Sequence, residues 1–273
     1  MNTQEKINHA ITLLRHYEPL AFQLNQSGYF LAFSGGKDSQ LLYLLAKEAG
    51  VKFRAYFSNT TNENPNNIQF IREVYKDVKF LNPKKNFYRL VSEKGLPTIN
   101  KRYCCAILKE QAGAGCVVLT GERREESTRR AQYSAVSHQS RNTIRNRDLE
   151  EFAEIKHECV KGKDKIRLRP LLEFTEKEVF DILNTFGVPL NPCYQNHNRI
   201  GCIFCPFSKK YEIEQYCLQF PRAKKKLLES LQQYLDKSEN NLLNNAEEYY
   251  DWWLSKKSIK QYIAEKQQLK LDL

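Results

Sequence analysis

Long apolar stretches are missing from this sequence. No run approaches the roughly 20 residues that cross a bilayer as a helix, although 41% of the 273 residues are hydrophobic. The first residues, "MNTQEKINHAITLLRHYEPL", mix polar and apolar side chains and contain no signal-peptide cleavage pattern. These absences predict a soluble, cytoplasmic protein with no membrane partner, long enough to bury one full α/β core and a small appendage.

An excess of acidic residues is also missing. Lys and Arg number 43 against 32 Asp and Glu, which gives a formal net charge of +11. Such a balance favours anionic partners, namely nucleotides, nucleic acid or a phosphorylated substrate. The positive charge alone does not identify the partner, because many basic proteins bind no nucleic acid.

No internal repeat is visible, so the organisation of the chain is inferred from its alternating helical and strand patterns. In order, the predicted elements are helix 4–26, strand 29–33, helix 38–49, strand 52–59, helix 65–76, strand 78–82, helices 86–95 and 104–113, strand 116–121 and helix 175–186. This alternation predicts an α/β fold with a doubly wound parallel sheet, whose ligands lie at the carboxyl ends of the strands. The polar stretch Ser134–Glu150 is predicted to be a loop. We expect residues 1–190 to form the nucleotide-binding α/β domain, and residues 191–273 to form a cysteine-bearing loop and a helical C-terminal extension packed on it.

The loop after the first predicted strand carries the strongest local signal. It reads Ser34-Gly35-Gly36-Lys37-Asp38-Ser39 and leads directly into a helix. Two flexible glycines, two hydroxyls and unpaired N–H groups at the positive end of a helix form a cradle for an anion. The two common phosphate-binding patterns, Walker A and G-x-G-x-x-G, do not fit this loop. The sequence therefore predicts an anion site of a different type.

A second set of residues follows the predicted strand 116–121, in the segment "VVLTGERREESTRRAQY". Arginines at the carboxyl end of a strand can clamp phosphate or sulfate through paired hydrogen bonds. The spaced residues of this element are Gly121, Arg123, Glu126, Ser127 and Arg130.

Together, the loop and this element resemble the phosphoadenosine phosphosulfate reductase family, a PP-loop family of the adenine nucleotide alpha-hydrolase superfamily with a HUP/Rossmann-like fold. The resemblance covers about residues 27–210 and implies that an adenine nucleotide binds, either ATP or one of the sulfated nucleotides, adenosine phosphosulfate (APS) and phosphoadenosine phosphosulfate (PAPS). The nucleotide-binding residues that it implies are Ser34, Gly35, Gly36, Lys37, Asp38, Ser39, Asn59, Thr60, Gly121, Arg123, Glu126, Ser127 and Arg130. Among these residues, Lys37, Asp38, Arg123 and Arg130 are expected to be catalytic.

Eight cysteines in a chain expected to be cytoplasmic indicate metal ligands or redox groups rather than disulfides. Cys104 and Cys105 are adjacent, and Cys202 and Cys205 form a C-x-x-C pair. This pattern resembles the ligands of the [4Fe–4S] cluster in assimilatory adenylyl-sulfate reductases, and four thiolates equally suit tetrahedral Zn²⁺. Cys193 is an alternative fourth ligand. The remaining thiols are expected to be core or incidental residues, namely Cys116, Cys159 and Cys217.

A nucleophilic cysteine near the end of the chain is missing as well. Reductases of this family carry a C-terminal Glu-Cys-Gly-hydrophobic-His segment, whose cysteine attacks the sulfate sulfur before thioredoxin releases it. In this sequence no cysteine follows Cys217, and Cys217 lacks the flanking Gly and His. Covalent capture of sulfite therefore has no evident residue to perform it.

Three functions stay open on these grounds, besides a plain ATP-pyrophosphatase-type ligase, which would need no cluster. The first is an oxidoreductase that reduces a sulfated adenine nucleotide with the help of a thioredoxin-like reductant. The second is an ATP-dependent sulfurtransferase that adenylates nucleic acid or another acceptor, in which Lys37 and Arg123 neutralise the phosphates, Mg²⁺ bridges them and Asp38 is a second-sphere ligand. The third is a non-catalytic nucleotide-binding partner protein with a structural zinc, whose basic stretch 222–226 recruits nucleic acid or a protein.

Overall fold

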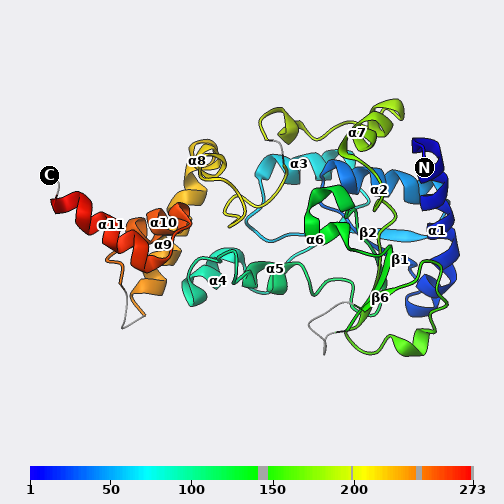
Figure 1. Cartoon of the computed structure of the whole chain (residues 1–273), viewed down its shortest axis with the longest axis horizontal. Coiled ribbons are helices and arrows are strands. Elements are labelled where there is room, and N and C mark those ends of the chain that lie inside the picture. Colours follow the sequence, from blue (N-terminus) through cyan, green and yellow to red (C-terminus); the bar gives the residue numbers. More distant parts are fainter. Residues whose placement is uncertain (141–146, 198, 238–241, 272–273) are drawn as a thin grey trace. The chain divides into compact units, whose positions relative to one another are not determined.

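The computed structural model describes residues 1–140, 147–197, 199–237 and 242–271. Contacts group the chain into two compact units, each built from segments that are far apart in the sequence (Figure 1). The sheet unit consists of Met1–Asn59, Pro65–Asn82 and Gln111–Ile200, and the helical unit consists of Thr60–Asn64, Pro83–Glu110 and Gly201–Leu273.

A sheet of seven described strands organises the sheet unit. The strands are β1 (Tyr29–Ala32), β2 (Phe53–Ser58), β3 (Lys79–Leu81), β4 (Val117–Leu119), β5 (Val136–Gln139), β6 (Arg147–Leu149) and β7 (Lys165–Leu168). Their order is β3-β2-β1-β4-β7-β5-β6; the first five are parallel, and β5 is antiparallel to both β7 and β6. The strand order reverses direction between β1 and β4, which is where sheets of this class bind their ligands. The predicted α/β fold with a doubly wound parallel sheet is confirmed, with the difference that β5 and β6 are antiparallel additions at one edge.

Some helices of the sheet unit begin at side-chain caps. The helices of this unit are α1 (Thr3–Leu24), α2 (Lys37–Glu48), α3 (Pro65–Val74), α6 (Thr128–Ala131) and α7 (Glu176–Thr185), with the short 3-10 helices η1 (Arg124–Glu126), η2 (His157–Cys159) and η3 (Pro192–Gln195). At the start of α1, Asn2 and Glu5 form a capping box, in which each side chain accepts a backbone N–H of the other residue. Thr175 and Glu178 form the same box at the start of α7. These caps fix the first turns of the helices.

The core of the sheet unit runs from α1 and α2 onto the central strands. Leu14 of α1, Leu41 and Leu45 of α2, and Leu31 of β1 are all fully buried in one apolar cluster. Full burial of such a side chain contributes about 1.5–3 kcal/mol. The packing of α2 on β1 therefore holds the loop between them, residues 33–36, at the carboxyl end of the sheet.

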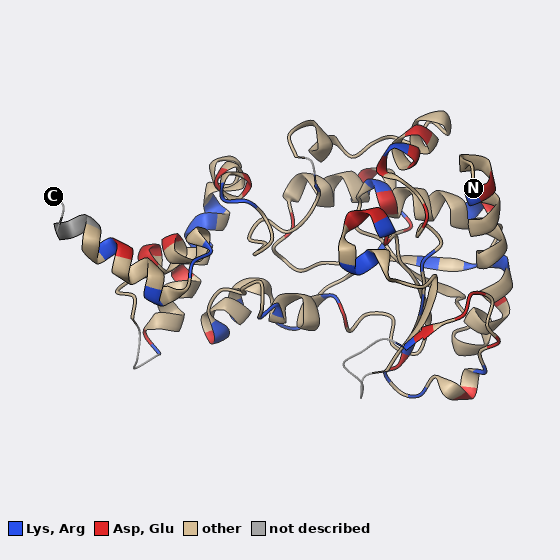
Figure 2. Ribbon diagram, viewed as in Figure 1, with Lys and Arg blue, Asp and Glu red and all other residues tan. Residues whose placement is uncertain are grey.

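The helical unit has its own apolar core. Its helices are α4 (Phe87–Lys94), α5 (Tyr103–Leu108), α8 (Lys210–Gln219), α9 (Pro221–Leu235), α10 (Ala246–Ser255) and α11 (Ile259–Leu271). Leu90 of α4, Leu227 and Leu231 of α9, and Trp253 of α10 are buried together. The basic stretch 222–226 lies in the first turns of α9, mostly exposed. Figure 2 shows Lys and Arg interspersed with Asp and Glu in both units.

Two predictions about local structure were wrong. The stretch Ser134–Glu150 was predicted to be a loop, but it contains the antiparallel strands β5 and β6; residues 141–146 of it lie outside the described residues. Val136 pairs with Leu149 and is fully buried, so tertiary packing stabilises strands that the sequence pattern does not favour. Helix 104–113 is shorter than predicted, because α5 ends at Leu108.

The compact units also differ from the predicted division at residue 190. The segments Thr60–Asn64 and Pro83–Glu110 belong with the C-terminal helices. The Ile203 N–H donates to the Asn62 carbonyl at 2.7 Å, and the Phe87 N–H donates to Thr61 Oγ1 at 2.8 Å, so these contacts attach the early segments to the helical unit.

Membrane-spanning character is not found in the described helices, none of which is both long and apolar enough to cross a bilayer.

The capping box of α7 predicts a pH dependence of stability. Burial disfavours the charged form of Glu178, but the Lys6 ammonium, 2.8 Å from Oε2, and the Thr175 N–H, at 2.7 Å, outweigh it and lower the pKa of Glu178 from 4.5 to about 2. Because this folded-state pKa is depressed, the contribution is present above about pH 4.5 and disappears as the pH falls toward 2. Denaturant unfolding should therefore give a smaller loss of stability between pH 5 and 2.5 in Glu178→Gln than in the unsubstituted protein.

Glu5→Gln is the control for this measurement, since Glu5 holds the equivalent place in the α1 capping box and forms no ion pair among the described residues. Equal pH profiles for Glu178→Gln and the unsubstituted protein would contradict the assignment.

Candidate functional site

The predicted anion loop forms a compact turn between β1 and α2. The Ser34 N–H donates to Ser39 Oγ at 3.2 Å, and the Ser39 hydroxyl donates to the Gly36 carbonyl at 2.8 Å. Gly35 has a φ of 78°, in the left-handed region that glycine adopts without strain. A Cβ at Gly35 would lie 2.3 Å from Asn67 Oδ1. The turn therefore requires glycine at position 35 for two separate reasons.

Two buried asparagines hold the loop in place. Asn67, in the first turn of α3, donates from Nδ2 to the Ser34 carbonyl at 3.1 Å. Asn191, directly before η3, donates from Nδ2 to the Gly35 carbonyl at 2.9 Å and to Asn67 Oδ1 at 2.7 Å. Both side chains are 1% exposed. Neither asparagine was predicted to belong to the site, because asparagines close to a proline are also the ordinary composition of a turn.

Lys37 is buried at the first position of α2, where its backbone and side chain are both engaged. Its N–H donates to the Tyr194 hydroxyl at 2.9 Å, and its Nζ lies 3.0 Å from Glu176 Oε1 and 3.5 Å from Asp38 Oδ2. The rings of Phe180 and Tyr194 flank the ammonium at 5.6 and 5.7 Å. Burial disfavours the charged form, but Asp38, Tyr194 and Glu176 outweigh it and raise the pKa of Lys37. Lys37 therefore stays a cation within a mostly enclosed site.

A closed chain of ion pairs, completed by one backbone hydrogen bond and here called the charge ring, lies at the start of α2. Its members are Lys37, Asp38, Arg123, Glu125 and Glu176. Arg123 Nε lies 2.6 Å from Asp38 Oδ1, and Arg123 Nη1 lies 2.7 Å from Glu125 Oε2. The Glu176 N–H donates to Glu125 Oε2 at 2.6 Å, and the Glu176 carboxylate returns to Lys37. The ring thus holds two cations and three carboxylates.

Arg123 lies at the carboxyl end of β4, and its position depends on a close approach of the backbone. A Cβ at Gly121 would lie 3.0 Å from the Asp38 carbonyl, so glycine lets the strand end and the start of α2 meet. Arg123 is 3% exposed. Burial disfavours its charged form, but Asp38 and Glu125 outweigh it and raise the pKa of Arg123. The guanidinium is therefore a fixed, permanent positive charge beside the loop.

The other side chains of the predicted element after β4, those of Glu126, Ser127 and Arg130, lie next to the charge ring but are not members of it. The Arg123 N–H donates to Glu126 Oε2 at 2.9 Å, and Arg130 forms an ion pair with the same carboxylate. The Ser127 hydroxyl oxygen accepts the Arg130 N–H at 3.2 Å and caps α6. Of the four residues predicted to be catalytic, the structure brings Lys37, Asp38 and Arg123 together directly, whereas Arg130 is connected to them through Glu126.

Asn59 and Thr60, two of the predicted nucleotide-binding residues, fall in different units. Asn59 follows β2 in the sheet unit, where its N–H donates to the Leu81 carbonyl at 3.0 Å. Thr60 belongs to the helical unit, where its hydroxyl donates to Glu63 at 2.9 Å and lies 3.6 Å from Cys202 Sγ. Their role in binding a nucleotide stays a prediction.

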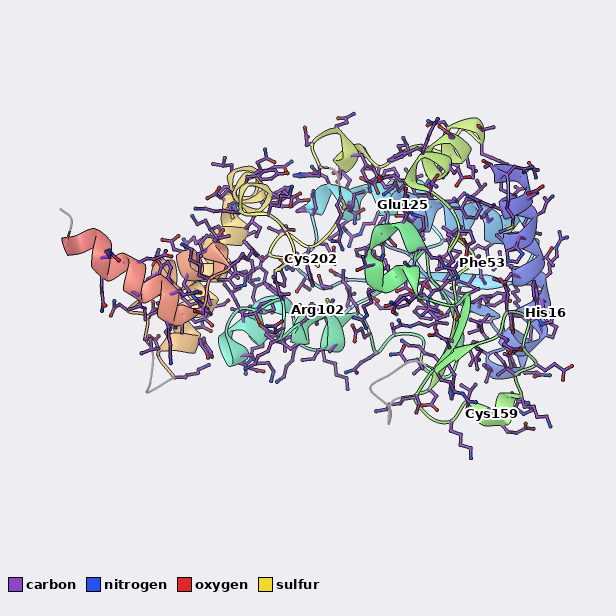
Figure 3. All side chains as sticks on the ribbon, in the orientation of Figure 1. His16, Phe53, Arg102, Glu125, Cys159 and Cys202 are labelled. Carbon is purple, nitrogen blue, oxygen red and sulfur yellow. The ribbon has the colours of Figure 1, made fainter. Side chains whose placement is uncertain are left out.

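Four of the cysteines predicted to bind metal belong to the helical unit. Cys104 and Cys105 lie on α5, and Cys202 and Cys205 lie on the turn before α8. Cys202 is labelled in Figure 3. Cys202 pairs with Glu63 through an antiparallel backbone bridge, and its thiol donates to Glu63 Oε1 at 3.5 Å. All eight cysteine side chains of the chain are free thiols.

The pKa values of these thiols are shifted in different directions. A hydrogen bond from Cys104, together with the positive charges of Lys109 and Arg102, lowers the pKa of Cys105. The hydrogen bond to Cys105 and burial raise the pKa of Cys104, with a further contribution from Cys202. Burial and the Glu63 carboxylate raise the pKa of Cys202 to about 12. The thiols on α5 and on the turn therefore influence one another electrostatically.

Within the described residues, no three Cys, His, Asp or Glu side chains stand close enough together to ligate one metal ion. Four cysteines from two short segments belong to the same unit, and thiolates are the donor type that soft metals prefer. Cys193, the alternative ligand, is buried in the sheet unit, and burial raises its pKa to about 11.

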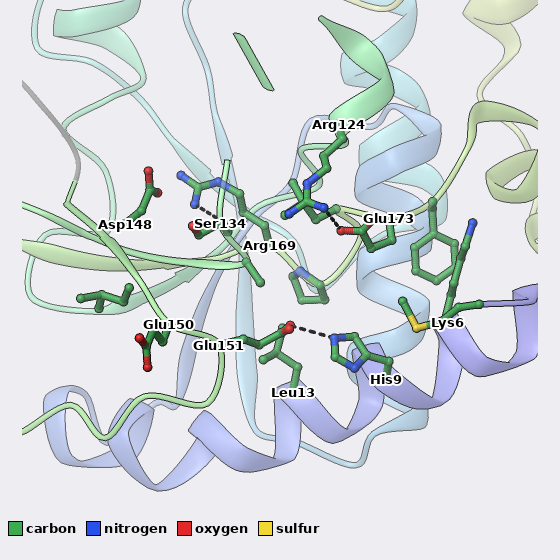
Figure 4. Close-up of a pocket in the computed structure, with 16 residues that line it drawn as sticks. Lys6, His9, Leu13, Arg124, Ser134, Asp148, Glu150, Glu151, Arg169 and Glu173 are labelled. Carbon is green, nitrogen blue, oxygen red and sulfur yellow. Dashed lines mark hydrogen bonds and ion pairs between the residues drawn. The ribbon is translucent and has the colours of Figure 1, made fainter. Parts of the chain in front are cut away.

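A pocket of about 450 Å³ lies elsewhere in the sheet unit (Figure 4). Residues of α1, of the β5–β6 hairpin and of the segment after β7 line it, among them His9, Glu151 and Arg169. Arg169 is anchored by Glu122, 2.6 Å from its Nε. No residue of the loop 34–39 lines this pocket, so the pocket is separate from the predicted anion site.

Comparison with known proteins adds to this geometry. Residues 28–208 match the family described as the phosphoadenosine phosphosulfate reductase domain. Two uncharacterized proteins of Methanocaldococcus jannaschii are each 26% identical to the chain, over 221 residues (76% of this chain, 42% of the relative) and 216 residues (74% and 47%). The chain thus spans less than half the length of these curated relatives.

Solved structures give similar neighbours. Phosphoadenylyl-sulfate reductase from Candida auris, in a phosphate complex, has a TM-score of 0.47 and 16% identity, with 71% of this chain and 87% of that chain covered. FMN adenylyltransferase of Candida glabrata, in complex with ATP, has a TM-score of 0.48 and 16% identity, with 73% and 61% covered.

The close contact at Gly35 predicts a large effect of substitution. Gly35→Ala should lower the free energy of unfolding by about 1–3 kcal/mol more than Gly50→Ala, as expected for overpacking. Gly50 is the matched control, since its φ of 70° carries the same backbone strain but a Cβ there meets nothing within 4 Å. Denaturant unfolding of both variants measures the difference, and equal losses would show that the contact with Asn67 is relieved at no cost.

Proposed function

The chain belongs to the phosphoadenosine phosphosulfate reductase domain family, and we propose that it is an enzyme that binds the phosphates of an adenine nucleotide on the loop Ser34–Ser39. One observation carries this proposal: the N-terminus of α2, the buried ammonium of Lys37 and the fixed guanidinium of Arg123 meet at one point. A helix N-terminus and paired cations together bind phosphate groups.

The charge ring favours Mg-ATP as the nucleotide. It holds three carboxylates and two cations, so a bare phosphate chain would enter a site that already has an excess negative charge. Mg²⁺ is normally bound mainly by phosphate oxygens and water, and it would offset this charge. Asp38, whose carboxylate is partly exposed, is the residue suited to act as its second-sphere ligand.

The reaction that follows from Mg-ATP is adenylation of an acceptor. A nucleophile of the acceptor attacks the α-phosphorus, the bond from this phosphorus to the bridging oxygen breaks, and pyrophosphate leaves. A sulfur nucleophile of the hydrosulfide or persulfide class then displaces AMP from the acceptor. Lys37 and Arg123 stabilise the charge that develops on the phosphate oxygens. Nucleic acid is one candidate acceptor, in keeping with the net charge of +11.

Reduction of APS or PAPS is the second candidate, favoured by the Gly121–Arg130 element that continues from β4. There, a reductant of the thioredoxin class would supply two electrons, and sulfite and the nucleotide would leave. A protein that binds nucleotide but releases neither pyrophosphate nor sulfite would instead be a binding partner.

For the metal centre, we propose that Cys104, Cys105, Cys202 and Cys205 hold a [4Fe–4S] cluster, with Zn²⁺ as the alternative. Their gathering in the helical unit supports this assignment. When bound, a cluster supplies electron transfer or a sulfur-binding iron, whereas zinc supplies structural stability. Lys109, 3.0 Å from the buried Glu63, supplies positive charge beside these thiols.

Nucleotide binding tests the proposed function. Isothermal titration of anaerobically purified protein should give tighter binding of Mg-ATP than of ATP in EDTA, APS or PAPS. Lys37→Ala should weaken Mg-ATP binding about tenfold or more, as expected for loss of a charged hydrogen-bond donor. Lys47→Ala, at the other end of the same helix, is the matched control.

Product chromatography of the same samples separates the candidates. AMP and pyrophosphate support adenylation, and sulfite formed with thioredoxin supports reduction. Unchanged affinity in Lys37→Ala would count against the loop as the nucleotide site.

Metal analysis tests the cysteine assignment. Cys202→Ser should lower the metal content to near zero and destabilise the helical unit, because a structural metal site contributes folding free energy directly. Cys217→Ser is the control, since this buried thiol contacts Tyr250 and belongs to no proposed ligand set. Iron with equimolar sulfide identifies the cluster, zinc identifies the alternative, and full metal content in Cys202→Ser would exclude Cys202 as a ligand.

A further inference from the structure

The groups with which the loop would bind a phosphate are already bonded to side chains of the protein itself. The first N–H groups of a helix have no partner within the helix, and these groups bind anions. In α2, the Lys37 N–H donates to the Tyr194 hydroxyl at 2.9 Å. The Lys37 ammonium has a carboxylate partner in Glu176, 3.0 Å away. Both positions are those that phosphate oxygens take at such a helix.

Tyr194 lies directly over the glycine turn. A Cβ at Gly36 would come within 3.2 Å of the Tyr194 hydroxyl, so the hydroxyl fills the space above the Gly36–Lys37 peptide. The ring of Phe180 supports it edge to face, with centroids 5.8 Å apart and planes at 78°. Tyr194 belongs to η3, and Phe180 and Glu176 belong to α7, so two elements after β7 cover the loop.

We propose that phosphate displaces the Tyr194 hydroxyl from the Lys37 N–H and the Glu176 carboxylate from the Lys37 ammonium. The two side chains thereby set the affinity of the loop for phosphate. This inference rests on the proposed function, because it assigns to the same loop the residues that compete with its ligand.

This exchange requires only that the side chains of Glu176 and Tyr194 move. Glu176 is 56% exposed, so its carboxylate turns into water with little loss. Tyr194 is only partly buried, whereas the neighbouring Asn191 is anchored to the Gly35 carbonyl and Asn67. The segment around η3 therefore stays attached while the tyrosine ring rotates. One donor cannot bond fully to a protein side chain and to a phosphate oxygen at the same time. Removing the Tyr194 hydroxyl or the Glu176 carboxylate therefore strengthens the binding of phosphate.

Titration calorimetry with inorganic pyrophosphate tests this inference on the full chain. Tyr194→Phe keeps the ring that flanks Lys37 and removes only the hydroxyl, and Glu176→Gln removes the charge at nearly constant volume. Each should tighten pyrophosphate binding about three- to tenfold, the range expected when one competing hydrogen bond is lost. Loss of a merely structural contact would not produce a gain in affinity.

Tyr133→Phe and Glu173→Gln are the matched controls and should leave the affinity unchanged. Tyr133 lies against Arg169, and Glu173 pairs with Arg124, so both lie outside the charge ring. Thermal unfolding of all four variants checks that each is folded.

Unchanged or weaker pyrophosphate binding in both Tyr194→Phe and Glu176→Gln would overturn the inference. In particular, weaker binding in Tyr194→Phe would mean that the hydroxyl contacts the phosphate. If the unsubstituted protein binds nucleotide while the variants show no gain, only the inference fails. If the unsubstituted protein and all variants bind neither pyrophosphate nor nucleotide, the proposed function fails with it.

Discussion

The ion pair between Arg123 and Asp38 is the contact on which the rest of the site depends. It joins the carboxyl end of β4 to the first turn of α2, with 2.6 Å between Arg123 Nε and Asp38 Oδ1. Arg123 is almost fully buried, so removing Asp38 would leave a buried charge without its main partner, which is strongly destabilising in proteins. Glu125 and Glu176 extend this pair to the start of α7. Three elements that meet at the switch point of the sheet are therefore held by one set of charges.

The same contacts explain how the site can be both rigid and responsive. Two buried side chains, Asn67 and Asn191, fix the backbone of the loop by donating hydrogen bonds to carbonyls of the turn. Its outward donors, by contrast, face acceptors on exposed or partly exposed side chains of α7 and η3. A scaffold held by buried bonds and a cover held by exchangeable bonds is suited to binding a charged ligand without rearranging the sheet.

In the helical unit, the environment of the thiols depends on contacts with a segment that is distant in the sequence. Residues 60–64 follow closely after β2 along the chain, yet they bond to residues 202–204, the first three residues of the C-x-x-C turn. Glu63 is thereby buried beside Cys202, and Lys109 of the segment after α5 neutralises it. The three segments that supply the thiols and their charged neighbours thus come together only in the folded unit.

Much of this protein was determined by local sequence. The glycine turn and the periodicity of the apolar residues predicted β1 to β4, α1 to α4 and α7 within a few residues, because each of these signals acts within one or two turns of chain. The loop motif and the family resemblance pointed to Lys37, Asp38 and Arg123, which the structure brings into contact with one another. The resemblance of spaced motifs then indicated the family before any contact was known.

Only the tertiary structure decided the rest, because it depends on partners distant in sequence. The β5–β6 hairpin exists because β7 offers a strand edge on which buried Val136 can pair, and its own pattern is too weak to predict it. Asn67, Asn191, Tyr194 and Glu176 look like ordinary turn and helix residues until the fold places them around the loop. Hydrogen bonds and ion pairs act over about 3–4 Å in space and leave no periodic trace in the sequence, so the acceptors that occupy the loop were decided by packing alone.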